Sequence, residues 1–164
     1  QLLFHEGKKS ILVGSSDELA EPLYDIKLRL KSNDILPGFG STFFLLSKEI
    51  TDSILIKDVN AYGLVKNKPE VLNQFLEKNN LTIKDIDTVY YTSSNLKTED
   101  YILNIFKDNK TIDIHKYCKS YLTNSSFGLH LAKDEMQSKN HKFSLVYNNL
   151  LDENLGLILI ENKK

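Results

Sequence analysis

The order of apolar segments predicts an α/β fold with a mixed, mostly parallel five-stranded sheet and helices on its faces. Short runs with β-branched centres, typical of buried strands, alternate with segments whose apolar residues recur at helical spacing. Strands separated by helices pair in parallel. The two strands nearest the C-terminus are joined by a short polar loop, which predicts an antiparallel hairpin. With 41% hydrophobic residues, the 164-residue chain has enough apolar material for one core.

The first 50 residues contain two predicted strands and a long irregular segment. Leu2–Phe4 resemble the end of a helix, and Ser10–Gly14 form a short apolar run that predicts a buried strand. Residues 17–40 hold two of the three prolines and predict irregular structure. Ser41–Leu46 are nearly all apolar, which predicts a strand covered on both faces.

The middle of the chain predicts strands and helices in alternation. In Ile54–Tyr62 apolar and polar residues alternate, which predicts a strand with one face more exposed to solvent. A helix is predicted to begin at Pro69, because the first turn of a helix does not need the N–H that proline lacks. Ile86–Thr92 predict the next strand. Thr98 predicts the cap of a second helix. The expected apolar faces of the two helices are Val71, Leu72, Phe75 and Leu76, and then Ile102, Leu103, Ile105 and Phe106.

The last third predicts a short strand, a helix and the terminal hairpin. The strand covers Ile112–Ile114, and Asn124 or Ser125 can cap the helix. Its expected inward residues are Phe127, Leu131, Ala132 and Met136. Phe143–Tyr147 and Gly156–Ile160 predict the two hairpin strands, which the loop Asn148–Asn154 joins.

Composition excludes several classes of function. Lys and Arg total 21 against 22 Asp and Glu, so nothing points to a nucleic acid. A lone cysteine, Cys118, fits a reducing cytoplasm, and we expect neither a membrane span nor a signal peptide. The four histidines lack metal-ligand spacing, so we expect no metal ion and no cofactor. Because the chain begins with Gln1, we expect a processed chain or a piece of a longer protein.

Four stretches, in order, carry a family resemblance: Ile11–Glu18, Leu36–Ser47, Asp85–Tyr91 and Lys116–Gly128. The first is similar to a strand that ends in a glycine turn, and the second to a strand that begins with a Pro-Gly motif. The third is similar to a hydrophobic strand before a catalytic loop, and the fourth to a lysine-containing loop with the helix that follows it. Together they resemble the β-ketoacyl synthases, condensing enzymes of the thiolase superfamily. The fourth stretch is closest to divergent synthase-like proteins of aryl-polyene and flexirubin-type pathways, and chain-length factors are also similar.

The resemblance implies a thiolase-like half with part of a second one. Residues 1–50 would supply the last two strands of the N-terminal half, and residues 51–164 the whole C-terminal half. A complete synthase is about twice as long. Its nucleophilic cysteine would precede Gln1, and Cys118 does not match it, so we expect no intact catalytic residue in this chain.

The resemblance also marks degenerate site positions. The loop that would hold the first catalytic histidine has hydroxyls and an amide instead, in Ser93, Ser94 and Asn95. Lys116 matches the family lysine, although His115 before it allows a slip of one residue, and Tyr121 then occupies the second histidine position. Hydroxyls, amides and phenols can donate hydrogen bonds to a developing enolate.

Three hypotheses of function follow. The first is a non-catalytic, chain-length-factor-like partner of an active synthase in fatty-acid or polyketide-type biosynthesis. The second is the C-terminal half of a split or cleaved acyltransferase whose nucleophile lies on another chain, with Tyr121 and the Ser93–Asn95 loop as substitute donors. The third is a stand-alone α/β binding module. Expected partners are the missing N-terminal half or a synthase subunit, and an acidic acyl carrier protein that Lys116, Lys119 and Lys133 could contact.

Overall fold

The computed structural model describes residues 7–17, 40–49, 54–93, 96–118, 124–149 and 154–164. The expected helix end at Leu2–Phe4 and most of the irregular segment lie outside these residues. Within them, the strands and helices follow the predicted order. In a search of the described residues, no helix is long and apolar enough to cross a membrane.

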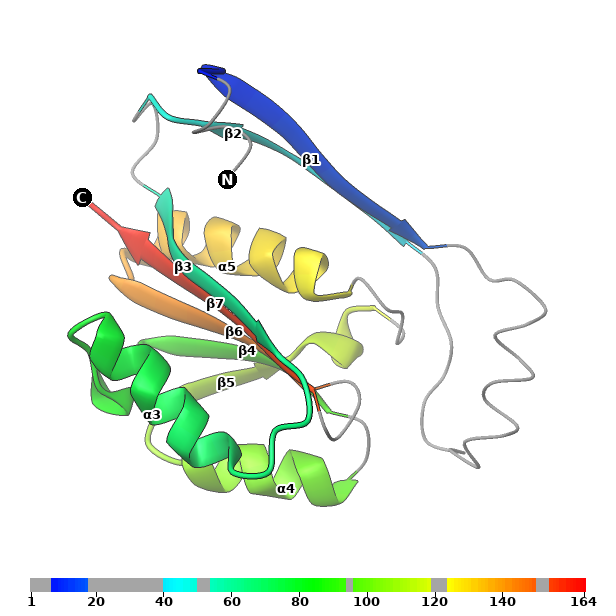
Figure 1. The fold of residues 1–164 in the computed structure, drawn as a ribbon, viewed down its shortest axis with the longest axis vertical. Coiled ribbons are helices and arrows are strands. Elements are labelled where there is room, and N and C mark those ends of the chain that lie inside the picture. The colour runs from blue at the N-terminus through cyan, green and yellow to red at the C-terminus, as the bar shows by residue number, and fades with distance from the viewer. Residues whose placement is uncertain (1–6, 18–39, 50–53, 94–95, 119–123, 150–153) are drawn as a thin grey trace.

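The larger sheet has five strands in the order β3-β7-β6-β4-β5 (Figure 1). Their bounds are β3 Ile54–Tyr62, β4 Thr88–Ser93, β5 Lys110–Asp113, β6 Phe143–Asn149 and β7 Leu155–Asn162. β4 pairs in parallel with β5 and β6, while β7 pairs antiparallel with both β6 and β3. Four of the five strands therefore run in one direction and only β7 is reversed, which confirms the mixed, mostly parallel sheet.

Helices cover both faces of this sheet. α3 (Lys68–Lys78) and α4 (Leu96–Ile105) lie on one face, and α5 (Asn124–Lys139) lies on the other (Figure 1). The side chain of Asn67 accepts a hydrogen bond from the backbone N–H of Glu70, which caps α3 ahead of Pro69. α4 begins two residues before Thr98, the predicted cap.

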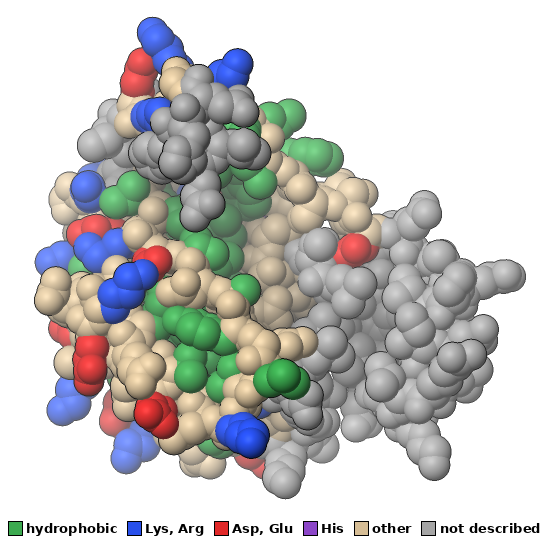
Figure 2. Space-filling view, in the orientation of Figure 1, with side chains coloured by type: hydrophobic (Ala, Val, Ile, Leu, Met, Phe, Trp, Pro, Cys, Tyr) green, Lys and Arg blue, Asp and Glu red, His purple; other side chains and the backbone are tan. Residues whose placement is uncertain are grey.

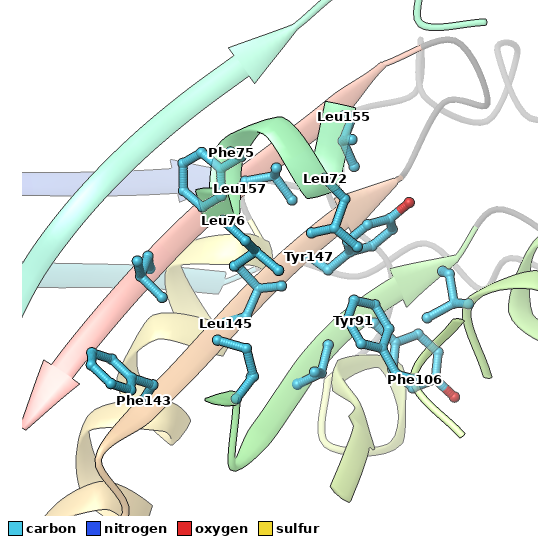
Figure 3. Packing of buried hydrophobic residues seen from close by; sticks show 14 residues of the cluster. Leu72, Phe75, Leu76, Tyr91, Phe106, Phe143, Leu145, Tyr147, Leu155 and Leu157 are labelled. Carbon is cyan, nitrogen blue, oxygen red and sulfur yellow. The ribbon is translucent and has the colours of Figure 1, made fainter. Parts of the chain in front are cut away.

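The two faces carry separate hydrophobic clusters. Figure 3 shows the cluster under α3 and α4, in which the rings of Phe106 and Tyr147 meet edge to face with centroids 5.7 Å apart. The labelled members are Leu72, Phe75, Leu76, Tyr91, Phe106, Phe143, Leu145, Tyr147, Leu155 and Leu157. The other cluster joins α5 to the sheet through Tyr90, Ile114, Ala132, Met136, Val146 and Ile160. Leu103, predicted to face inward, is instead exposed.

β1 (Ser10–Asp17) and β2 (Gly40–Ser47) form a separate two-stranded antiparallel sheet, which we call the ribbon. The ribbon lies over α5, so α5 is sandwiched between the two sheets (Figure 1). Ser15 and Ser126 join the ribbon to α5 by a hydrogen bond of 2.6 Å between their hydroxyls.

The prediction that Ser41–Leu46 are covered on both faces is wrong for this chain. Residues of β2 alternate between exposed and partly buried, because α5 covers only the inner face of the ribbon. On the outer face, Phe43 and Leu45 are 62% and 72% exposed. An apolar strand signals that both faces get covered, but not which polypeptide covers them.

Candidate functional site

The parallel strands β4, β5 and β6 end at the same edge of the sheet, and polar residues gather there. In open α/β sheets this carboxyl edge is where ligands usually bind. Ser93 is the last residue of β4 and pairs with Asn149, the last residue of β6. Asp113 ends β5, where it is the neighbour of Tyr91. The sequence-predicted position Ser93 is therefore part of this edge.

Hydrogen bonds fix the ends of β4 and β6 to each other. The hydroxyl of Thr92, a buried residue, donates to Oδ1 of Asn148 at 2.9 Å. The hydroxyl oxygen of Thr92 in turn accepts a hydrogen bond from the backbone N–H of Asn149 at 3.2 Å. The edge is thus held by side chains as well as by the ladder, and the polar groups beside it have a rigid support.

Asn149 is wholly buried, yet within the described part of the chain neither polar atom of its side chain has a hydrogen-bond partner. The hydroxyl of Tyr147, two residues earlier and therefore on the same face of the sheet, also lacks one there. Burial raises the pKa of Tyr147, which keeps the phenol protonated. A buried polar group without a partner costs about 1–3 kcal/mol, so these groups are candidates to bind a ligand or water.

A second polar group lies where β5 leads to α5. The 3-10 turn η2 (Ile114–Lys116) follows β5, and Oδ1 of Asp113 accepts the backbone N–H of His115 at 2.9 Å. Nδ2 of Asn124, the first residue of α5, lies 3.1 Å from Nε2 of His115. Asn124 is wholly buried, and its Oδ1 has no partner among the described residues.

His115 is uncharged in this setting. Burial lowers its pKa, and the attraction of Asp113 and Glu99 opposes that shift only in part. A neutral imidazole carries its proton on one nitrogen, and Oδ1 of Asp113 lies 3.7 Å from Nδ1. With the proton on that side, Nε2 accepts the N–H of Asn124, and the amide oxygen of Asn124 is left for another donor.

The structure separates the remaining predicted site residues. Lys116 is exposed at the end of η2, and the residue that faces the polar edge is His115, one position earlier. Ser94, Asn95 and Tyr121 lie outside the described residues.

Cys118 is not placed as a nucleophile. Its thiol lies 3.5 Å from the carbonyl oxygen of Ile114, to which it can donate, and it follows a 3-10 turn rather than starting a helix. Activation of a catalytic thiol normally needs a helix N-terminus or a nearby cation. Among the described residues, no group of three His, Cys, Asp or Glu could hold a metal ion.

Sequence reasoning missed three residues of this edge. Asn124 was expected to serve as a helix cap and Asn149 to belong to a loop, and His115 entered only as a source of a one-residue slip. The available signal was position: Asn149 ends the buried strand β6, and His115 comes two residues after β5. A polar residue at the carboxyl end of a buried parallel strand faces the edge where ligands bind. Chemically, two buried amides can polarise or orient a carbonyl group.

Solved structures of condensing enzymes resemble this chain. A β-ketoacyl synthase from Burkholderia phymatum matches 99% of it at a TM-score of 0.74 and 8% identity, and 57% of that synthase is covered. The ishigamide ketosynthase/chain length factor matches 99% of this chain at a TM-score of 0.72 and 11% identity, and 52% of that protein is covered. A structure of a type II PKS acyl-carrier protein in complex with its ketosynthase matches 98% of this chain at a TM-score of 0.68 and 13% identity, and 54% of the matched chain is covered.

The chain therefore spans little more than half the length of these three structures. Neither a protein-family model nor a curated protein sequence matches it. At identities of 8–13% the likeness concerns the fold alone. This chain therefore has a fold similar to that of the ketosynthases it matches.

Proposed function

We propose that this chain is the C-terminal portion of a β-ketoacyl synthase-like protein and acts, without catalysing the condensation itself, as a chain-length-factor-like partner of an active synthase. The observation that carries the proposal is a carboxyl edge with buried amides but no activated thiol. Asn124 and Asn149 have side-chain atoms without partners among the described residues, while the thiol of Cys118 points to the Ile114 carbonyl.

The chemistry of condensation divides into two parts. A thiolate must accept the acyl group, and hydrogen-bond donors must stabilise the enolate. The described residues offer only groups of the second kind. Groups of this kind bind and orient an acyl thioester without forming a bond to it. In this reading the chain shapes the acyl site, and the synthase partner supplies the nucleophile.

A second candidate is the C-terminal half of an active acyltransferase, with its nucleophilic cysteine on another chain or segment. The pair of His115 and Asn124 favours this acyltransferase, because His115 orients the amide of Asn124. An oriented amide is useful as a hydrogen-bond donor only if a substrate carbonyl group binds next to it. Tyr121 and the Ser93–Asn95 loop would then be substitute donors. The outer face of the ribbon speaks against a stand-alone binding module, because its apolar residues are exposed.

The proposed partners are a synthase subunit, as in a dimer, and an acyl carrier protein. Carrier proteins are acidic, so a basic contact is expected. Lys116 is exposed and Lys133 is partly exposed, while Lys119 lies outside the described residues. The single cysteine and the balanced charge are consistent with a cytoplasmic protein of this kind.

The experiment is acyl loading of the assembly as isolated from its source. Acyl carrier proteins carrying hexanoyl and malonyl groups are added, each chain is weighed by intact mass spectrometry, and product lengths are measured. We expect an acyl adduct on the synthase subunit and none on this chain. An adduct on Cys118, or an unchanged product after removal of this chain, contradicts the proposal. An adduct on a cysteine of the companion half supports the acyltransferase instead.

A pair of asparagine variants sharpens this test. Asn124→Ala removes a buried amide and should alter the distribution of product lengths, while the synthase subunit is acylated as before. Asn154→Ala removes an exposed asparagine just before β7 and should change neither. If the two variants give equal distributions of product lengths, Asn124 does not contribute to the acyl site.

A further inference from the structure

The contact between His115 and Asn124 decides which end of a buried amide is offered to a ligand. Nδ2 of Asn124 lies 3.1 Å from Nε2 of His115. A carboxylate oxygen of Asp113 lies 3.7 Å from Nδ1, the other ring nitrogen. A lone pair on Nδ1 would face this anion, so the proton of the neutral ring belongs on Nδ1. Nε2 then carries the lone pair and accepts an N–H of Asn124.

The amide of Asn124 cannot turn over without losing this hydrogen bond. With its oxygen toward Nε2 of His115, two lone pairs would face each other. Oδ1 is therefore held on the side away from the ring. Asn124 is wholly buried, and its Oδ1 has no hydrogen-bond partner among the described residues. Because a buried carbonyl oxygen without a donor is costly, this position favours a group that brings an O–H or an N–H.

The other polar groups of the carboxyl edge narrow the class of ligand. In the described part of the chain, both side-chain polar atoms of Asn149 and the hydroxyl of Tyr147 are buried without partners. The edge therefore needs hydrogen-bond donors as well as acceptors. A hydroxyl group supplies both, whereas a ketone only accepts and an amide N–H only donates. A cation fits less well, because burying a charge costs far more than burying a hydroxyl.

Surface charge offers no competing means of selection. Figure 2 shows basic and acidic side chains interspersed over the face that it draws. The whole chain is balanced as well, with 21 Lys and Arg against 22 Asp and Glu. Discrimination between ligands is therefore expected from hydrogen bonds inside the site.

We propose that Asn124, oriented by His115 as a positioning residue, makes this site select acyl thioesters with a hydroxyl group on the acyl chain over those with a ketone. The hydroxyl donates a hydrogen bond to Oδ1 of Asn124, and no covalent bond forms or breaks. This inference rests on the proposed function, because it names the substrate class of the acyl site that the chain is proposed to shape.

Protonation of His115 should remove the selection. The protonated ring carries an N–H on both nitrogens, so Asn124 turns its oxygen toward Nε2 and offers its N–H to the ligand. The groups that face the ring are Asp113 at the end of β5, Glu99 of α4 and Asn124 of α5. Burial lowers the pKa of His115 from 6.5 in spite of the two acids. The hydroxyl preference is therefore retained above pH 6.5 and is lost only below it.

The test measures ligand binding by the assembly as isolated from its source, purified through a tag on this chain. The probes are 3-hydroxyhexanoyl, 3-oxohexanoyl and hexanoyl pantetheine, each with an amide in place of the thioester so that no acyl group is transferred. Calorimetric titration at pH 8 should show the hydroxyl probe binding about tenfold or more tightly than the other two. At pH 5 this preference should be lost. Equal affinities at pH 8, or a preference that does not change with pH, would overturn the inference.

Variants of His115 separate positioning from packing. His115→Phe keeps a ring but removes the acceptor Nε2, so the amide of Asn124 is free to turn over and the preference should vanish. His115→Gln keeps an acceptor that cannot be protonated, so the preference should persist at pH 8 and no longer change with pH. His130→Phe is the matched control, because His130 is half-exposed on α5 beside Asp134, and its preference should equal that of the unmodified chain.

Two further measurements keep the outcomes separate. Protected amides in β6 and β7 show that a variant is folded, and the pH profile of the unmodified chain stands even if His115→Phe does not fold. A preference that survives in folded His115→Phe, or disappears in His115→Gln, would overturn the positioning role. An acyl adduct on Cys118 contradicts the proposed function whatever the probes show. Equal binding of the probes, with the acyl group on the synthase subunit, overturns this inference alone.

Discussion

Two of the antiparallel strand pairs, β1–β2 and β6–β7, have similar length and opposite surroundings. β6 and β7 lie inside the larger sheet, with strands on both sides and helices on both faces. Among the described residues no further strand pairs with β1 or β2, and the outer face of the ribbon is exposed. Both pairs are rich in leucine, valine and isoleucine, so sequence composition does not explain the difference.

The comparison shows how much of a strand's stability comes from its neighbours. An isolated two-stranded pair is marginal in water and needs further strands or a helix to persist. The ribbon has α5 on one face and a hydroxyl pair, Ser15 with Ser126, as its polar tie. β6 and β7 contribute wholly buried leucines to the core, among them Leu145, Leu157 and Leu159. We therefore expect the two pairs to respond very differently to the same substitution.

The largest expected difference comes from truncating one leucine in each pair. Leu157 in β7 is wholly buried, so Leu157→Ala should cost about 2–5 kcal/mol of unfolding free energy. Leu45 in β2 is mostly exposed, and Leu45→Ala should cost less than about 0.5 kcal/mol in the isolated chain. Urea denaturation followed by circular dichroism measures both. Similar costs would mean that the outer face of the ribbon is already covered.

The same contrast explains how far the sequence predicts this fold. Periodicity identified every strand and α-helix that the structure describes, but not its two 3-10 turns, because burial of one face or of both leaves a pattern in the order of apolar residues. Coverage of Ser41–Leu46 on both faces was predicted wrongly for this chain, since α5 covers only the inner face of the ribbon. Thr98 was not the start of its helix, because boundaries depend on local contacts that periodicity does not include.

The candidate site was harder to predict than the fold. The resemblance identified Ser93, which ends β4 at the polar edge, and it selected Lys116, which is exposed. His115 and Asn124 are the residues that meet. An asparagine at a helix start looks the same in sequence whether its side chain caps the helix or is buried among side chains from another strand. Only the packing of α5 on the sheet distinguishes these cases.

An intermediate effect is expected from the polar ties of α5. Glu135 accepts hydrogen bonds from Lys110, Lys139 and Tyr90, which joins α5 to β4 and β5. Glu135→Gln should cost about 1–2 kcal/mol, because solvent screens the two half-exposed lysines. Ser126→Ala, which removes the tie to the ribbon, should cost less than about 1 kcal/mol and should speed hydrogen exchange in β1 and β2 only.

The pH dependence of stability identifies the Glu135 contribution. Burial opposes the charge of Glu135, but the bonds from Lys110, Lys139 and Tyr90 outweigh it and lower its pKa from 4.5 to about 2. The unfolded chain then binds the proton more readily, so this contribution is complete above about pH 4.5 and is lost as the pH falls through about 2. Thermal melts between pH 2 and 7 should show a smaller acid loss in Glu135→Gln. An equal loss would assign it to other carboxylates.

The smallest effect concerns one glycine in each region. A Cβ on Gly128 of α5 would lie 2.4 Å from Cδ1 of Ile114, which is wholly buried and has little room to move. Overpacking outweighs the gain in helix propensity, so Gly128→Ala should lose about 1 kcal/mol. On β1, Gly14→Ala meets the ring of Phe43, but this ring is free to swing into solvent, and the change should stay within about 0.5 kcal/mol.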